Sequence, residues 1–445
     1  MMTWQAIASL AVFGGVIFFL TTEWIHFTVA SMLGALLLIA LNVITVNEAF
    51  SYIGNSHVTL ALFFGVMVMV RAFEPTKIFE YLGTQIVIWA KGRGDRLLLA
   101  IVGIVTPICA VLPNATTVML LAPLIPPIAE EVGVDFVPLL ILMVFVANSA
   151  GLLTIIGDPA TFIVGSSINL SFTDYLLRLS FGGVVAILVI VAMLPILFRH
   201  IWRKKLQDLE RLPHVKIQHP KVLLWGGGIA AVVLIFFIVG EMLPVPVSPA
   251  TVALLGATLI MLITHHSKTE SVSHILRDVD WSTLLFFMSI FVLIGSLEKT
   301  GVISSLSGVL AIVLGKNIAL GAITLVFFVG AISALVPNIP LVIAMVPLLK
   351  QYVVNVGLAN PEVLEKGFTG QFPPAVLPLF YAMMFGATLG GNGTVVGASS
   401  NIVAAGIAEQ HGKRISFRRY LLYGVPMTVL QLTAAAVFIT LRFLL

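Results

Sequence analysis

Asp158 is an acidic residue inside a long apolar stretch, in the segment T-I-I-G-D-P-A-T-F, where glycine and proline would interrupt a helix. An ionisable group in such surroundings is costly and by default indicates function. We therefore expect Asp158 to take up and release a proton. A second interpretation stays open, in which Asp158 only caps the helix that its own break creates.

Two Pro-Asn pairs offer amide and hydroxyl groups in similarly apolar surroundings. The segments PNATTVMLLAPL at Pro113 and PNIPLVIAMVPL at Pro337 share Pro, Asn, Val, Pro and Leu at a constant offset of 224 residues. Proline removes a backbone donor and breaks a helix. The two surrounding segments, 97–131 and 317–350, are therefore predicted to be hairpins that enter and leave a bilayer on the same side, with tips shielded from lipid.

A second pair of breaks follows in TIIGDPATFIVGSS around Gly157 and in GATLGGNGTVVGASSN around Gly391. We expect two broken helices, at 137–170 and 375–410, whose half-helix ends turn toward a shared cavity. Asn392 is taken as the counterpart of Asp158. Because an amide has the shape of a protonated carboxyl but does not titrate, the chain is predicted to hold one protonatable site.

The composition excludes a soluble protein, since 59% of residues are hydrophobic, 10% are charged and the mean hydropathy is +1.10. The first apolar run lacks the features of a removable signal peptide and is expected to remain as a helix. Apolar runs near the ~20 residues needed to cross a bilayer lie at about 4–21, 27–46, 58–73, 137–154, 178–198, 222–243, 249–264, 281–297, 375–390 and 418–440.

These runs predict an all-α polytopic membrane protein with about ten transmembrane helices plus two re-entrant hairpins. The first inverted repeat is 1–198, the cytoplasmic linker is 199–221 and the second inverted repeat is 222–445. Because each repeat has five full crossings, an odd number, the second copy must be upside down relative to the first. Inverted repeats usually place their substrate site at the membrane midplane, where we expect the broken helices to meet.

Charge predicts the orientation. Most of the 24 lysines and arginines fall on one side once the basic cluster is placed in the cytoplasm, which agrees with the positive-inside tendency. Both termini are then outside a cell (inner) membrane. The cluster consists of Arg199, Arg203, Lys204, Lys205, Arg211, Lys216 and Lys221.

Cofactor chemistry is not expected. The single cysteine, Cys109, cannot form an intramolecular disulfide or a multi-thiolate metal site, and the histidines lack ligand spacing. A Walker-type element is absent from the sequence, so an ATPase could only be a separate cytoplasmic subunit. The sorted charges indicate bilayer orientation rather than nucleic-acid binding.

The motifs PNATT, GDPAT, PNIPLVIAMVPL and GGNGT with SSN resemble the ion transporter superfamily, and within it the ArsB/NhaD/P-permease branch, most closely an arsenite efflux permease. The resemblance covers nearly the whole chain and implies a scaffold, a mobile transport unit and frequently a homodimer. It implies that Asn114, Thr116, Thr117, Asn338, Thr394 and Asn401 line the site. With the neighbouring loop positions, the expected substrate-binding set is Asn114, Ala115, Thr116, Thr117, Gly157, Asp158, Pro159, Thr161, Asn338, Gly391, Asn392, Gly393, Thr394 and Asn401.

The resemblance, taken together with the chemistry of the site, implies proton-coupled efflux of arsenite, with antimonite as a second solute. No basic side chain falls at the tips or breaks to compensate a multivalent anion, which favours a small neutral solute or a single cation. Sodium/proton antiport is the alternative, with carboxylate, amide and carbonyl oxygens as ligands. Dicarboxylate or other anion transport ranks third. An intramembrane aspartyl protease needs two carboxylates that share a proton, and no second buried aspartate is expected.

Overall fold

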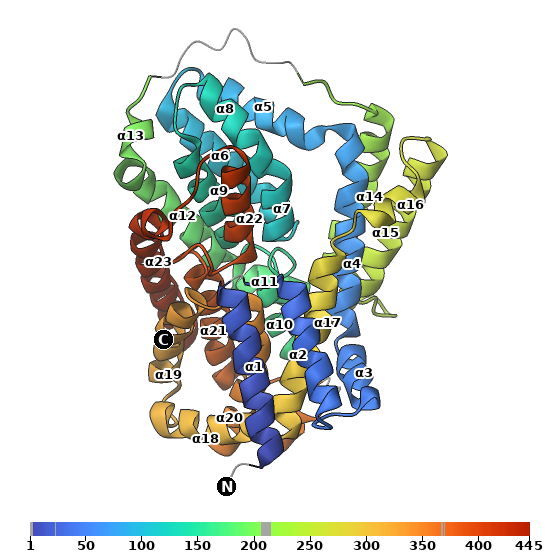
Figure 1. The fold of residues 1–445 in the computed structure, drawn as a ribbon, viewed down its shortest axis with the longest axis vertical. Coiled ribbons are helices and arrows are strands. Elements are labelled where there is room, and N and C mark those ends of the chain that lie inside the picture. Colours follow the sequence, from blue (N-terminus) through green and yellow to red (C-terminus); the bar gives the residue numbers. More distant parts are fainter. Residues whose placement is uncertain (1–2, 23, 206–214, 366–367, 369) are drawn as a thin grey trace.

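The computed structural model describes residues 3–22, 24–205, 215–365, 368 and 370–445. Part of the predicted cytoplasmic linker, including Arg211 of its basic cluster, lies outside the described residues. Figure 1 shows an assembly of helices whose long axes mostly run along the vertical direction of the view. The prediction of an all-helical membrane fold is confirmed.

The first half of the chain forms α1 to α13. Their bounds are α1 (Trp4–Thr22), α2 (Phe27–Ala40), α3 (Val46–Asn55), α4 (His57–Phe73), α5 (Ile78–Ala90), α6 (Gly94–Cys109), α7 (Asn114–Leu121), α8 (Ile125–Glu131), α9 (Phe136–Ala150), α10 (Pro159–Ser167), α11 (Phe172–Arg178), α12 (Ser180–Leu197) and α13 (Arg199–Trp202).

The second half forms α14 to α23. Their bounds are α14 (Pro220–Val239), α15 (Pro249–His266), α16 (Val272–Arg277), α17 (Trp281–Lys299), α18 (Val302–Leu314), α19 (Ile318–Ser333), α20 (Asn338–Asn355), α21 (Leu377–Gly390), α22 (Ser399–Gln410) and α23 (Phe417–Ile439).

The two halves repeat element by element. Helices α5 and α6 have the same lengths as α18 and α19, and each pair begins and ends 224 residues apart. After the Pro-Asn tips, the loop between α20 and α21 is longer than its counterpart, and the offset at α10 and α22 becomes 240. The internal duplication inferred from the sequence therefore governs most of the fold.

Helices α5 and α18 show that the second copy is inverted. Helix α18 lies across the fold and meets α19 at 115°. In Figure 1, α5 runs near the top of the molecule and α18 runs near the bottom. Each follows a left-handed residue, Lys77 (φ 57°) before α5 and Gly301 (φ 77°) before α18, so equivalent turns begin equivalent helices at opposite ends of the molecule.

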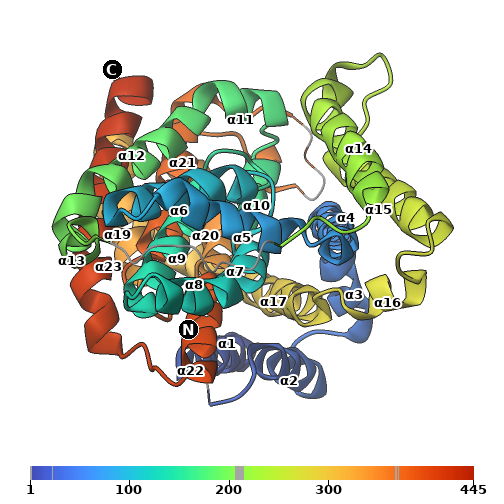
Figure 2. The same cartoon turned by 90° about the horizontal axis from the view of Figure 1, so that it is seen from above.

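Two groups of helices lie side by side. Figures 1 and 2 place α1–α4 and α14–α17 on one side, which we call the scaffold, and α5–α13 with α18–α23 on the other, which we call the core unit. Small residues allow close packing within each group. A side chain at Gly65 of α4 would collide with Ala253 of α15, and one at Gly390 of α21 would collide with Gly330 of α19.

Eight described helices are long and apolar enough to cross a membrane, or up to nine if the bent pair α18 and α19 counts as one span. The predicted runs 137–154 and 375–390 form shorter helices, α9 and α21, because each ends at a glycine where the chain breaks. The boundaries of the repeats and the re-entrant course of the two hairpins stay predictions.

Ion pairs fix several helix ends. Arg71 and Glu74, at the end of α4, form an ion pair with 2.9 Å between their nitrogen and oxygen atoms. Lys299 does not mirror this arrangement, since its ammonium lies 2.7 Å from Glu48 on α3 rather than bonding Glu298. The second half thus uses a residue of the first half to hold its equivalent helix end.

Candidate functional site

Two Pro-Asn tips supply equivalent side chains to the middle of the core unit. Pro113 and Pro337 are the N-cap residues of α7 and α20, and their backbone angles agree within about two degrees (φ −53°, ψ 137° and φ −51°, ψ 138°). Proline suits the start of a helix, where its missing N–H would be unpaired in any case. Asn114 and Asn338 are consequently the first residues of their helices, and both side chains are buried.

The two broken helices follow the same plan. Residues 151–158 separate α9 from α10, and residues 391–398 separate α21 from α22. Thr154 donates a hydrogen bond to the Ala110 carbonyl, and Thr394 donates to the Ala334 carbonyl, so each break is tied to the helix before its own tip. Gly157 is required at its position, because a Cβ there would be 2.7 Å from the Cys109 carbonyl oxygen.

Asp158 is fully buried at the N-cap position of α10 and accepts hydrogen bonds from both halves of the chain. Thr388 Oγ1 donates at 2.9 Å, Asn114 Nδ2 and Thr161 Oγ1 at 3.4 Å, and Asn338 Nδ2 at 3.5 Å. We call these five residues the carboxylate cage. Its donors are uncharged, and the partial positive charge of the helix starts around it also favours an anion.

A second polar group, which we call the amide cluster, centres on Asn148 of α9. Its Nδ2 atom donates to Asn392 Oδ1 at 2.9 Å and to Asn401 Oδ1 at 3.0 Å. Its Oδ1 atom accepts from Ser400 at 2.6 Å and from Asn114 at 3.0 Å. Asn114 therefore joins the amide cluster to the carboxylate cage, and its amide is shared between Asn148 and Asp158.

The amide cluster continues toward α12 and α23. Asn392 donates to Gln431 Oε1 at 2.8 Å, and Gln431 donates to Ser149 at 2.8 Å and to the Ala186 carbonyl at 3.1 Å. These side chains are all buried. Such a network is stable only when its members are satisfied, so it fixes how the two halves are oriented relative to each other.

The structure corrects one residue correspondence. Asp158 and Ala398 are the N-cap residues of α10 and α22, whereas Asn392 lies early in its loop and is equivalent to Leu152. The correspondence of Asp158 with Asn392 is therefore wrong. Among the described residues, Asp158 is the only fully buried acid. Its structural counterpart, Ala398, has no polar group in its side chain.

The other predicted residues take varied positions. Ala115 donates its N–H to Asn114 Oδ1 at 2.8 Å, and Thr117 is buried beside the Cys109 thiol. Asn401 Nδ2 donates to the carbonyls of Gly391 and Thr394. Three more residues shape the backbone or lie near the tip without a hydrogen bond to the cage, namely Thr116, Pro159 and Gly393.

Five polar residues outside the predicted substrate-binding set also lie in the centre of the core unit. These are Asn148, Ser149, Thr388, Ser400 and Gln431. Asn148, Ser149, Thr388 and Gln431 are isolated polar residues in apolar helices, and such residues indicate a functional or interhelical role. Their occurrence within predicted spans was a usable signal.

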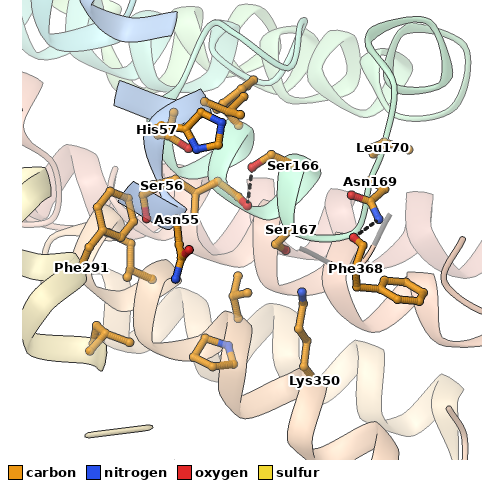
Figure 3. Close-up of a pocket in the computed structure, with 18 of the residues that line it drawn as sticks. Asn55, Ser56, His57, Ser166, Ser167, Asn169, Leu170, Phe291, Lys350 and Phe368 are labelled. Carbon is orange, nitrogen blue, oxygen red and sulfur yellow. Dashed lines mark hydrogen bonds between the residues drawn. The ribbon is translucent and has the colours of Figure 1, made fainter. Parts of the chain in front are cut away.

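An open vestibule of about 770 Å³ leads toward this centre from the end of the molecule that holds α3 and α18. Its walls come from both units, and Figure 3 shows polar side chains around it, including Asn55, Ser167 and Lys350. Ile155, Phe162 and Ile163, on the segment around Asp158, form part of its lining. Since Asp158 has no exposed surface, the vestibule stops short of the carboxylate in this conformation.

Two inverted copies of a broken-helix fold, with a polar centre inside apolar helices, define a membrane transporter. The chain belongs to the CitMHS family, described as citrate transporters, whose model matches residues 17–364. An uncharacterized transporter of Synechocystis sp. is 67% identical over 98% of this chain and 97% of that protein. The human P protein is 28% identical, and the match covers 96% of this chain and 59% of the P protein.

Solved transporters share the fold at low sequence identity. The YdaH transporter of Alcanivorax borkumensis matches with a TM-score of 0.61 and 10% identity, over 89% of this chain and 87% of that one. MtrF of Neisseria gonorrhoeae, described as one of a class of antimetabolite efflux pumps, matches with a TM-score of 0.56 and 13% identity over 92% and 85%. The narrower assignment to the arsenite permease branch stays a prediction.

Proposed function

We propose that this chain is a proton-coupled secondary transporter in which Asp158 carries the coupled proton. The observation that supports this proposal is the carboxylate cage itself, a single fully buried acid held by uncharged donors from both halves. Burial disfavours the charged form, and hydrogen bonds from amides and hydroxyls favour it. A carboxyl under such opposing influences is suited to change its protonation when access to water changes.

The position of the carboxylate cage within the core unit supports an alternating-access mechanism. All five of its residues belong to the core unit, on α7, α10, α20, α21 and the break before α10, and none belongs to the scaffold. Lys77 and Gly301 stand at the two chain connections from scaffold to core unit. We propose that the core unit moves against the scaffold about these connections and exposes the cage to each side in turn.

Arsenite, and with it antimonite, is the first solute we propose, with export as the direction. Near neutral pH, trivalent arsenic is mainly an uncharged hydroxide with three hydroxyl groups. Amide and hydroxyl groups of Asn114, Asn338 and Thr388 can exchange their bonds with Asp158 for bonds to such a solute. Among the described residues, no lysine or arginine contacts the cage, which suits an uncharged solute.

Sodium/proton antiport is the alternative, and the oxygen content of the centre favours it. Asp158, Asn148, Thr388 and Asn401 bring carboxylate, amide and hydroxyl oxygens into one buried region, and hard cations prefer such ligands. A sodium ion would compete with the proton for Asp158. Sodium would be bound through its positive charge, whereas arsenite would be bound through its hydroxyl groups.

Citrate or another carboxylate is supported by the description of the family and by the helix starts that surround the centre. Three negative charges would meet the negative charge of Asp158 without a basic side chain in the cage. We therefore rank carboxylates third for the cage. A homodimer, a location in the inner membrane and a separate cytoplasmic ATPase subunit complete the proposal.

The proposed proton-coupled transport can be tested in everted membrane vesicles that have an acidic interior and contain a pH-sensitive dye. We expect arsenite to dissipate the pH gradient in vesicles that contain the wild-type protein, and not in vesicles that contain Asp158→Asn. Dissipation by sodium alone would replace the first solute with the second, and dissipation by citrate alone would favour the third. If no solute collapses the gradient, or if the variant behaves like the wild type, the coupling role of Asp158 is wrong.

A further inference from the structure

A basic pocket lies at the edge of the core unit, away from the candidate site. It has a volume of about 290 Å³ and is formed by the start of α9, the end of α12 with α13, and the start of α23. Figures 1 and 2 place α12, α13 and α23 on the side of the core unit that faces away from the scaffold. Its described lining includes His200, Lys204, Arg419 and one acid, Asp135. The proposed transport chemistry uses none of these four residues.

The basic groups at this pocket outnumber the acid. Asp135 pairs with Arg419 and with Lys413, whose Nζ atom is 3.0 Å from Oδ1, so its charge is already compensated. Lys204 donates a hydrogen bond to the Gly133 carbonyl and forms no ion pair among the described residues. An ammonium has three hydrogens, and Arg419 uses its Nη2 atom for Asp135, so both basic groups keep donors for a further ligand. The pocket therefore suits a negatively charged group.

The repeated architecture does not require an arginine at position 419. Ser171 and Ser416 are the N-cap residues of α11 and α23, and they accept the backbone N–H groups of Asp174 and Arg419, respectively. Asp174 and Arg419 are therefore counterparts with opposite charges. The partial positive charge of a helix start favours an acid at this position and disfavours an arginine. A role specific to this end of the molecule is the simpler explanation of Arg419.

The surface beside the basic groups becomes aromatic and then aliphatic. Phe198 and Tyr423 both line the pocket, with 5.2 Å between their ring centroids, and the Tyr423 hydroxyl makes no hydrogen bond within the described part of the chain. The neighbouring positions Ile196 on α12 and Leu422 on α23 are 62% and 68% exposed. Aromatic side chains with a polar tip favour the level of lipid headgroups, whereas exposed aliphatic side chains suit the acyl chains. The order of these surfaces matches that of a phospholipid, from headgroup to tail.

We propose that this pocket binds the headgroup of one anionic phospholipid from the surrounding bilayer. The phosphodiester accepts hydrogen bonds from Lys204 and Arg419, and the Tyr423 hydroxyl reaches the same headgroup. The acyl chains lie along Ile196 and Leu422. A basic pocket between helices at the membrane surface is suited to such a headgroup, and the charge distribution predicts that this surface is the cytoplasmic one. The proposal goes beyond the transport function and does not depend on which solute crosses.

Quenching by brominated lipids measures whether such a lipid is bound. A fluorophore on Ile196→Cys reports acyl chains beside the pocket, and one on Phe181→Cys, an exposed position in the first turn of α12, reports the other leaflet. The natural Cys109 is fully buried, so the unmodified protein gives the background. In phosphatidylcholine nanodiscs, brominated phosphatidylglycerol should bind near the Ile196 probe about tenfold more tightly than brominated phosphatidylcholine. The Phe181 probe should show no preference.

Variants of the basic groups separate the pocket from the general surface charge. Lys204→Gln keeps a donor for the Gly133 carbonyl but loses the charge, so the preference should fall about fivefold. Lys204→Arg keeps the charge and should keep the preference. Arg418→Gln removes an equal charge from an exposed residue next to Arg419 that does not line the pocket, and it should also keep the preference. Thermal unfolding in a zwitterionic detergent checks that each variant is folded.

Inorganic phosphate distinguishes a lipid from a free anion. At constant ionic strength, phosphate should leave the quenching by brominated phosphatidylglycerol unchanged. Loss of that quenching would assign the pocket to free phosphate and overturn the assignment to a lipid. Equal binding of both brominated lipids to the wild type, or equal losses in Lys204→Gln and Arg418→Gln, would overturn the headgroup site itself. These readouts need neither a transported solute nor proton flux, so failure here is distinguishable from failure of the proposed function.

Discussion

The two halves of the chain bring matching backbones to the centre of the molecule but give them different chemistry. Asp158 in the first half corresponds to Ala398 in the second, and Thr161 corresponds to Asn401. As a result, one side of the centre is a carboxylate cage and the other is a closed network of amides. The comparison teaches that the repeated backbone sets where the side chains lie, whereas the residue types, which differ between the halves, set the charge.

The largest expected effect comes from removing that asymmetry. Asp158→Asn keeps the shape of the side chain and can still bond Thr388, but it cannot release a proton. We expect solute-driven proton flux in proteoliposomes to fall to the level of protein-free vesicles, while the melting temperature stays close to that of the wild type. Glu130→Gln, at an exposed acid of the same half, is the matched control and should transport normally.

Moving the acid to the mirror position sharpens the same comparison. Adding Ala398→Asp to Asp158→Asn should not restore flux, because Asn148 already uses its two amide hydrogens for Asn392 and Asn401. A carboxylate at position 398 would lack donors. Restored flux in the double variant would show that the two half-sites are chemically interchangeable and that the amide cluster does not discriminate between them.

Asn148 and Thr388 are mirror-related and should differ in what they contribute to stability. Asn148→Ala removes four side-chain hydrogen bonds, and Thr388→Ala removes one. At about 0.6 kcal/mol for each such bond inside a membrane, the expected losses are about 2 and about 0.6 kcal/mol. Unfolding by SDS in mixed micelles measures both, and equal losses would contradict the central place of Asn148.

The two connections from scaffold to core unit give a smaller effect. Gly301→Ala forces a side chain into a left-handed conformation and should destabilise the protein by about 1 kcal/mol. Lys77→Gly relieves the same conformation at the mirror position and should be neutral or slightly stabilising. The changes in melting temperature are expected to have opposite signs in the two variants. A lower melting temperature in both would mean that Lys77 contributes to stability through its side chain.

The smallest expected effect on stability concerns the ion pair between Lys299 and Glu48. In the second half this pair takes the place of the pair that Arg71 and Glu74 form in the first half. A hydrogen bond from Lys299 and the Thr45 amide lower the pKa of Glu48 to about 2. Because the folded-state pKa lies below the ordinary value of 4.5, this stabilisation is present above about pH 4.5 and is lost as the pH falls toward 2. Between pH 6 and pH 3, wild-type stability should fall more than that of Glu48→Gln, by about 0.5 kcal/mol for so exposed a pair. Parallel pH profiles would show that the pair is not formed in solution.

Much of the fold could be predicted because apolar runs and glycine-proline breaks are local signals. The offset of 224 residues located the Pro-Asn tips and the hairpin segments that contain α6 and α19, whereas α5 and α18 were not among the predicted helices. The register was lost after α20, where the second half has the longer loop. Gly157 was then matched with Gly391 instead of Gly397, which shifted the counterpart of Asp158 from Ala398 to Asn392.

The candidate site was predicted less completely, for a physical reason. Asp158, Asn114 and Asn338 lie at breaks, and breaks can be recognised in a sequence. Asn148 and Gln431 lie in continuous helices, and only the packing of α9 against α22 and of α23 against α12 shows that they meet other polar groups. Lys350 lies about three turns beyond its tip, so its place in the vestibule depended on how α20 packs against α10 and α17.

The single acid of the centre also has an electrical consequence. If the core unit carries Asp158 across the membrane in its ionised form on one half of the cycle and as the neutral acid on the other, one elementary charge crosses the membrane field in each turn. That displacement corresponds to about 2.3 kcal/mol for every 100 mV. Membrane voltage would then bias the resting population of the carrier even when no pH difference exists across the bilayer.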